Sequence, residues 1–139
     1  MLSKAIAMAA AAFQDKKDKG GKPYILHCLR VMNDVDQADE ALMCIAVLHD
    51  LLEDCPERLE EFTNANFGSR IVRAIQTLTH HETDSYDDYI ERIALNEDAR
   101  IVKLADLKDN SNITRLKGMR KKDFDRMKKY HRAFIYLSQ

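Results

Sequence analysis

A chain of 139 residues is the length of one domain and is long enough to bury a hydrophobic core. With 45% apolar and 32% charged residues, its composition is that of a soluble globular protein and excludes a disordered or low-complexity chain. The net charge of -1 indicates no general attraction to nucleic acid or to an anionic membrane, and no apolar run approaches the ~20 residues of a membrane span.

The first half of the chain is expected to form three helices. Residues 2–13 repeat apolar side chains at helical spacing, so we interpret them as the first helix rather than as a signal peptide. Gly20 and Gly21 break this pattern, and Pro23 suits the start of a second helix. A third helix is expected at about residues 39–52. Because it is apolar almost all round, it should lie at the centre of the fold.

Helices are also expected throughout the second half. Pro56 opens a short acidic helix, and Ser69 can cap another that ends near residue 78. Residues 86–93 form a helical stripe, Asn96 precedes a further helix, and residues 123–137 are expected to form the terminal one. No run alternates with period two for long enough to indicate a sheet. The sequence therefore predicts an all-α helical bundle, with a single domain over residues 1–139.

Cysteine usage indicates the cellular compartment. Cys28, Cys44 and Cys55 are an odd number of cysteines, and none are spaced as a CxxC pair. This pattern fits a reduced cytoplasmic protein better than a disulfide framework or a zinc knuckle.

The segment His-Asp-Leu-Leu-Glu-Asp at residues 49–54 places four ionisable groups at the end of the most apolar helix. Burying such groups is costly unless they are paired or bind a cation. His49 and Glu53 are four residues apart, as are Asp50 and Asp54, so the set is expected to share one side of the helix. For a lone His-Asp pair, a capping histidine followed by solvated acids would be the simpler interpretation.

Two further segments add potential metal ligands. His27 lies on an apolar segment, where a lone histidine is usually a hydrogen-bonded core residue. Asp106 follows apolar residues and, taken alone, would be a plausible salt-bridge partner for Lys103; Asp109 and Asn110 lie one turn further along. Together the segments offer two imidazoles and two carboxylates, enough for four sites of an octahedral cation with positions left for water and substrate. The four candidate ligands are His27, His49, Asp50 and Asp106.

The order His … His-Asp … Asp resembles the HD superfamily of metal-dependent phosphohydrolases. Finer signatures are similar to the hydrolase domain of the RelA/SpoT family, and especially to its small single-domain alarmone hydrolases, the Mesh-type proteins. The signatures are Pro-Tyr-Ile-x-His at residues 23–27, His-Asp-x-x-Glu-Asp at 49–54 and Lys-Leu-Ala-Asp-x-x-x-Asn at 103–110. The resemblance covers about residues 14–116. A His-Asp pair is weakly specific, but three signatures in this order and spacing are strongly specific.

The resemblance implies a helical HD fold and a Mn²⁺ ion, or another divalent transition metal, held by the four candidate ligands. It also implies a small-molecule phosphorylated nucleotide as substrate, with removal of the 3′-pyrophosphate from guanosine tetra- or pentaphosphate. Glu53 and Asp54 match the family acids that orient or activate water, and Asn110 matches an asparagine that contacts the substrate near its ribose. The other positions that fall at or beside the substrate pocket are Lys19, Tyr24 and Lys103.

The loop before Pro23 departs from the family pattern. The family typically carries an Arg-Lys pair there, whose arginine packs against guanine, whereas this chain has Lys-Asp-Lys-Gly-Gly at residues 17–21 with Asp18 roughly at the arginine position. A guanidinium plane can stack on a purine and a carboxylate cannot, so guanine recognition is left open while the metal chemistry is unaffected. Cys28 replaces the usual proline after the histidine, and we interpret it as a tolerated packing change.

Two alternatives follow. The first keeps the chemistry but changes the substrate to another phosphorylated nucleotide, such as NADPH or a nucleoside phosphate. The second is a non-catalytic, metal-stabilised binding module. The presence of both Glu53 and Asp54 argues against the binding module, because a purely structural site does not need them.

The remaining polar and aromatic groups are interpreted as structural. His80 and His81 are expected in an exposed turn, and His131 is expected on the surface of the terminal helix. Tyr86 and Tyr89 are three residues apart and are more simply a packing stripe than ligand contacts. Two basic clusters are more simply solvated faces, but either could attract a phosphorylated ligand; they are Lys16, Lys17, Lys19 and Lys22, and residues 115–122.

Overall fold

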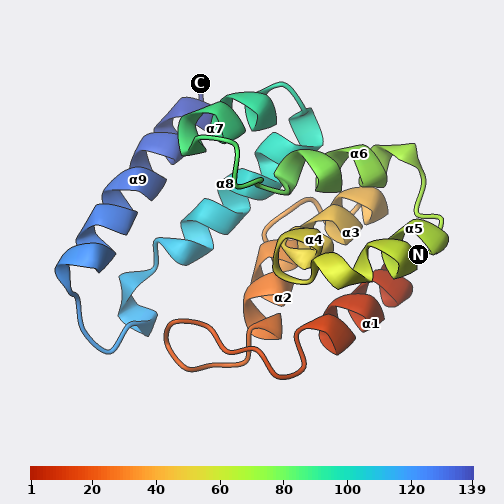
Figure 1. The fold of residues 1–139 in the computed structure, drawn as a ribbon, viewed down its shortest axis with the longest axis horizontal. Helices are drawn as coiled ribbons and strands as arrows, with labels where there is room; N and C mark the ends of the chain where they lie inside the picture. Colours follow the sequence, from red (N-terminus) through yellow and green to blue (C-terminus); the bar gives the residue numbers. More distant parts are fainter.

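The computed structural model describes residues 1–139 and contains nine α-helices, two short 3₁₀-helices and no strand (Figure 1). The prediction of an all-α fold is therefore confirmed. The elements in chain order are α1 (Leu2–Ala12), α2 (Ile25–Asn33), α3 (Glu40–Leu48), α4 (Leu51–Asp54), η1 (Pro56–Arg58), α5 (Leu59–Asn64), α6 (Ser69–Leu78), α7 (Tyr86–Ala94), α8 (Glu97–Asn110), η2 (Ile113–Arg115) and α9 (Lys121–Leu137).

Helix α3 lies at the centre of the bundle. Every residue from Leu42 to Leu48 is buried, and the helix packs against α1, α2, α6 and α8. Its start is fixed by Asp39, whose side chain accepts a hydrogen bond from the Leu42 backbone at 3.0 Å. The predicted central position is confirmed, because a helix that is apolar all round is stable only where neighbouring helices cover each face.

The prediction that this helix continues to residue 52 is wrong at one point, since it is interrupted at His49 and Asp50. In a continuous helix the Ala46 carbonyl would accept the Asp50 backbone N–H. Here that carbonyl accepts the His49 backbone N–H at 3.4 Å and His49 Nδ1 at 2.7 Å. Asp50 leaves helical geometry (φ -101°, ψ 1°) and precedes α4. The break lets two consecutive side chains face the same point, although a regular helix would separate them by about 100°.

The starts of the later helices test the predicted capping residues. Asn96, expected only to precede a helix, is the N-cap of α8, since its side chain accepts the Ala99 backbone N–H at 2.9 Å. Ser69 is wrong as a cap: it is the first residue of α6, and Gly68 precedes it at φ 97°, a conformation that glycine adopts without strain. Helix α9 begins at residue 121 rather than 123, and Asp123 accepts a backbone N–H at 2.9 Å in its first turn.

Helix α8 joins the two sides of the molecule. Figure 1 shows it between the group formed by α1 to α6 and the terminal helix α9, and it packs against α2, α3, α6, α7 and α9. Residues on α8 therefore lie where most of the bundle meets.

The three cysteines are buried and unpaired, as their spacing indicated. None of the helices combines the length and the apolar character that a membrane crossing requires.

Candidate metal centre

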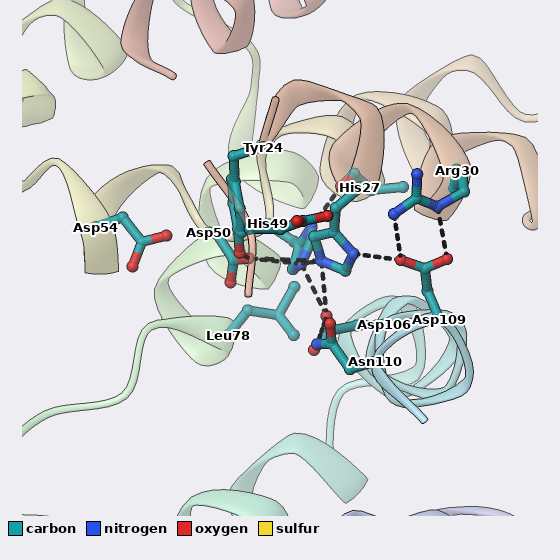
Figure 2. Close-up of polar contacts among 12 residues, drawn as sticks. Tyr24, His27, Arg30, His49, Asp50, Asp54, Leu78, Asp106, Asp109 and Asn110 are labelled. Carbon is teal, nitrogen blue, oxygen red and sulfur yellow. Dashed lines mark hydrogen bonds and ion pairs between the residues drawn. The ribbon is translucent and has the colours of Figure 1, made fainter. Parts of the chain in front are cut away.

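Four ionisable side chains from three parts of the fold meet at one point (Figure 2). His27 comes from α2, His49 and Asp50 from the break between α3 and α4, and Asp106 from α8. One nitrogen or oxygen atom of each lies within 4.8 Å of the corresponding atoms of the others. Both histidines and Asp106 are buried, and Asp50 is half-buried. The structure thus brings together the four candidate ligands.

Hydrogen bonds at Nδ1 fix how both imidazoles face the centre. His27 Nδ1 lies 2.6 Å from a carboxylate oxygen of Asp109, and His49 Nδ1 lies 2.7 Å from the Ala46 carbonyl oxygen. An ionised carboxylate and a carbonyl oxygen only accept, so Nδ1 carries the proton in each ring. In its neutral form each imidazole therefore presents the lone pair of Nε2 to the centre, which is the arrangement found in histidine metal ligands.

The atoms that face the centre are close together. The two Nε2 atoms are 3.3 Å apart, and Asp106 Oδ1 lies 3.0 Å from the Nε2 of His27 and 3.2 Å from that of His49. Asp50 Oδ2 lies 3.0 Å from His49 Nε2 and 3.8 Å from His27 Nε2. These are electron-pair donors with no protein cation between them.

The surroundings of the cluster shift the pKa values of all four side chains. Burial by itself would raise the pKa of Asp50, but the charge and hydrogen bond of His49, together with the charge of His27, lower this pKa to about 2. The pKa of Asp106 is held well below its usual value against burial, chiefly by Lys103 and His49. Burial would lower the pKa of His27 and of His49, yet both are raised because carboxylates surround the rings.

Such a cluster needs positive charge at its centre, supplied either by protonated histidines or by a divalent cation. Two imidazole nitrogens and two carboxylate oxygens suit Mn²⁺, Fe²⁺, Co²⁺ or Zn²⁺. The donor set, its Nδ1 anchoring and its burial therefore fit a divalent transition metal, and the cluster could hold one.

Three residues expected to contact substrate also support the carboxylates of the cluster. Lys103 Nζ lies 2.8 Å from Asp106 Oδ2, and Asn110 Nδ2 donates to Asp106 Oδ1 at 2.9 Å. The Tyr24 hydroxyl donates to Asp50 Oδ2. All three side chains also line the adjoining cleft, so each can contact both a metal-ligating carboxylate and a substrate bound in the cleft.

The two acids of α4 lie beside the cluster without joining it. Glu53 Oε1 accepts the His80 backbone N–H at 2.8 Å, and Asp54 Oδ2 pairs with Lys16 Nζ at 2.6 Å. Burial raises the pKa of both carboxyls. Both side chains line the cleft, and Figure 2 shows Asp54 on the side of Asp50 away from the histidines. A carboxylate with a raised pKa is a stronger base than a solvated one.

The two carboxylates of the cluster, Asp50 and Asp106, line a cleft of about 310 Å³, large enough for a small ligand. A second hollow, of about 440 Å³ between α7 and α9, contains none of the candidate ligands, so we assign the chemistry to the smaller cleft. Acidic and basic side chains alternate along its lining, since Lys16 pairs with Asp54, Lys103 with Asp106 and Arg115 with Asp18. The acidic residues of the lining are Asp18, Asp50, Glu53, Asp54 and Asp106, and the basic ones are Lys16, Lys17, Lys19, Lys103, Arg115 and Arg126.

Asp18 organises the loop that borders the cleft. Its Oδ1 accepts the backbone N–H groups of Gly20 and Lys22, each at 2.9 Å, and its Oδ2 lies 3.2 Å from Arg115 Nη1. Gly20 packs so closely on the chain near η2 that a Cβ there would lie 2.5 Å from the Arg115 carbonyl oxygen. Asp18 is therefore a structural residue, and it holds a guanidinium from η2 against the cleft wall.

Two residues that shape the site belong to the basic clusters, for which a solvated face was the simpler interpretation and attraction of a phosphorylated ligand the alternative. Lys16 and Arg115 reach it from a loop and from η2, and only the folded chain places them there. The expectation of an exposed turn is right for His81 but wrong for His80, which is half-buried with its ring 4.7 Å from that of Tyr89. The interpretation of Tyr89 as a packing residue is confirmed, since it is buried and its hydroxyl donates to a backbone carbonyl.

Comparison with known proteins agrees with this geometry. A family model described as HD domain matches residues 5–121. A guanosine-3′,5′-bis(diphosphate) 3′-pyrophosphohydrolase of Aquifex aeolicus (strain VF5) is 30% identical over 119 residues, covering 78% of this chain and 17% of the relative. A GTP pyrophosphokinase of Myxococcus xanthus is 29% identical over 126 residues, covering 79% of this chain and 16% of the relative. The chain therefore spans about a sixth of the length of these curated relatives. The match over most of its length shows that the chain belongs to the HD domain family.

Proposed function

We propose that this chain is a divalent-metal-dependent phosphohydrolase acting on a phosphorylated nucleotide, with Mn²⁺ as its metal and guanosine 3′,5′-bis(diphosphate) as the first substrate to test. The observation that carries the proposal is the convergence of His27, His49, Asp50 and Asp106 beside a cleft that lysines and arginines also line. The name of the Aquifex relative supplies the candidate substrate. Free buried thiols support a cytoplasmic location as part of the same proposal.

The ligand cluster and the cationic side chains of the cleft suit the two needs of phosphate-ester hydrolysis. A divalent cation held by the four ligands would polarise a phosphoryl oxygen and lower the pKa of a water molecule. The cationic walls would neutralise the charge of the remaining phosphates. Lys103 is well placed for this, because its ammonium group lies 2.8 Å from Asp106 and also faces the cleft. Lys19, an exposed residue of the loop before Pro23, also lines the cleft.

Glu53 is the proposed general base. Its carboxylate lines the cleft, burial raises its pKa, and the His80 backbone N–H holds one oxygen at 2.8 Å, which leaves the other free to take a proton from water. In hydrolysis of a 3′-diphosphate, the water oxygen bonds to phosphorus, the bond from phosphorus to the ribose 3′ oxygen breaks, and that oxygen gains a proton. Asp54, paired with Lys16, is proposed to orient the water or the departing group.

Tyr24 and Asn110 are proposed to contact the substrate beside the ligands. Their polar groups already bond to Asp50 and Asp106, so a nucleotide that reaches the metal must pass close to both side chains. This arrangement favours a role in placing the ribose and the scissile phosphate.

A different phosphorylated nucleotide is the second candidate substrate, and one observation favours it. Asp18 is turned into its own loop by two backbone N–H groups, so this loop presents no guanidinium to a base. Arg115 supplies a guanidinium from another direction, held by Asp18 and by Asp109. A nucleotide whose base packs against Arg115 then need not carry guanine.

The test is a nucleotide screen with metal-free protein reloaded with Mn²⁺. Guanosine 3′,5′-bis(diphosphate), NADPH, GTP and nucleoside monophosphates are compared for release of pyrophosphate and of orthophosphate. Pyrophosphate release from the first supports the leading substrate, whereas activity on another nucleotide rejects it and keeps the chemistry. Complete inactivity with Mn²⁺ bound at one ion per chain would instead favour a binding module.

Three variants assign the roles in this screen. Asp50→Ala is expected to lose Mn²⁺ binding and hydrolysis together, and Glu53→Gln is expected to bind Mn²⁺ while losing hydrolysis. Asp98→Ala is the matched control, because it also removes a half-buried, ion-paired aspartate; Asp98 lies 2.8 Å from Arg70 and does not line the cleft.

A further inference from the structure

Asp109 lies directly behind one of the two histidines. It is one turn beyond Asp106 on α8, and its carboxylate approaches His27 from the side opposite the other candidate ligands (Figure 2). Its Oδ2 lies 2.6 Å from His27 Nδ1. The side chain is 14% exposed, and it lines neither the cleft nor the ligand cluster. Asp109 therefore contacts a candidate ligand without reaching the substrate or the metal itself.

Two arginines hold this carboxylate in place. Arg30, on α2 with His27, donates to Asp109 through Nε at 2.8 Å and through Nη2 at 3.1 Å. Arg115 Nη2, from η2, lies 3.2 Å from Asp109 Oδ2 and donates to the Asp109 carbonyl oxygen at 2.5 Å. A carboxylate bound by two guanidinium groups has little freedom to rotate, so the oxygen that faces His27 stays in position.

The two histidines are supported in different ways. His49 Nδ1 uses the Ala46 backbone carbonyl of its own helix, which no side-chain substitution removes. His27 Nδ1 depends on the side chain of another helix. A charged acceptor behind an imidazole fixes the tautomer and the ring orientation, and it raises the basicity of the opposite nitrogen.

We propose that Asp109, clamped by Arg30 and Arg115, is a positioning residue that holds His27 with Nε2 directed at the metal site. The inference rests on the proposed function only in that the four ligands bind a divalent metal. It adds that the affinity of this site depends on a residue that contacts neither the metal nor the substrate.

The test measures Mn²⁺ affinity of the full metal-free chain by calorimetry. Loss of such a support typically weakens metal binding by about 10- to 100-fold, and we expect that range for Asp109→Ala. Asp109→Asn should fall between the wild type and Asp109→Ala, because an amide oxygen still accepts the Nδ1 proton but carries no charge. Arg30→Gln, which leaves the contact between His27 and Asp109 in place, should lose less than Asp109→Ala.

Asp98→Ala is the matched control, since Asp98 is also an arginine-bound aspartate of α8 and contacts no candidate ligand. It should bind Mn²⁺ as the wild type does. A second measurement uses Co²⁺ at saturating concentration, whose visible absorption reports ligand geometry. Asp109→Asn should change this spectrum, and a purely structural role would leave it unchanged.

The outcomes are distinguishable. Equal Mn²⁺ affinity in the wild type, Asp109→Ala and Asp109→Asn would overturn the positioning role while leaving the metal site intact. Absence of Mn²⁺ binding in the wild type would overturn the metal site and the positioning role together. An affinity loss as large in Asp98→Ala as in Asp109→Ala would also overturn the positioning role, because general destabilisation would then explain the loss. If Asp109→Ala does not fold, Asp109→Asn decides by the same two measurements.

Discussion

The pair formed by Lys103 and Asp106 allows stability and metal binding to be separated. Their atoms are 2.8 Å apart, with side chains 13% and 4% exposed, so each charge depends on the other in the metal-free protein. Removing one partner of a buried pair costs roughly 3–5 kcal/mol. We expect Lys103→Met and Asp106→Asn each to lower the free energy of unfolding by about 3 kcal/mol, the lower end of this range. The loss is limited because the neighbouring histidines can also pair with Asp106, and because Lys103 reaches the cleft.

The double variant is the decisive member of this series. With both charges removed, neither partner is left buried and unpaired, so the loss should be far below the roughly 6 kcal/mol sum of the single losses. Unfolding by urea in the presence of a chelator measures the free energy of unfolding of all four proteins, and unchanged m-values confirm that the comparison is like for like. Asp106→Asn and the double variant should both fail to bind Mn²⁺ tightly, although only the first is strongly destabilised.

Two results would refute this reasoning. If the losses of the single variants simply add in the double variant, Lys103 and Asp106 are not coupled as their geometry indicates. If the double variant binds Mn²⁺ with wild-type affinity, Asp106 is not a metal ligand.

Further predictions concern pH, the loop and the proposed base. The pKa values of His27 and His49 are raised in the folded metal-free protein, so the stability that their protonation contributes is complete below pH 6.5 and is lost as the pH rises. Midpoints of urea unfolding, measured in chelator, should therefore fall from pH 6.5 upward. A rise would contradict the pKa directions. Gly20→Ala places a Cβ 2.5 Å from the Arg115 carbonyl oxygen and should cost about 1–3 kcal/mol in urea unfolding, so an unchanged midpoint would exclude this close packing. Glu53→Gln should lower kcat by about 100-fold or more without changing Mn²⁺ affinity, and a parallel loss of affinity would show that Glu53 is not simply a base.

The helical fold could be predicted from the sequence because its cause is local. Apolar residues recur at helical spacing, and turn residues separate the segments. The central position of α3 followed from its composition, and the start of α8 just after Asn96 followed from the apolar pattern that begins there. The candidate ligands could be chosen because three segments each carried ionisable groups beside apolar residues, although spacing alone did not show that they meet.

What could not be predicted depends on contacts between distant or competing groups. The break after α3 arises because the His49 ring takes the Ala46 carbonyl from the helix, and a helical pattern contains no sign of that competition. The partners Asp18 and Arg115 are 97 residues apart, so the sequence indicated only that a carboxylate replaced an expected arginine. Asp109 was noted as a neighbour of Asp106 on its helix, but its contact with His27 crosses from α8 to α2.

The central claim is that His27, His49, Asp50 and Asp106 together hold a divalent ion. Calorimetric titration of the chelator-treated full chain with Mn²⁺, repeated with Asp50→Ala and with the Asp98→Ala control, tests it most directly. The account predicts a single site in the wild type, the same site in the control and no tight binding in Asp50→Ala. No binding by the wild type, or unchanged binding by Asp50→Ala, would contradict it.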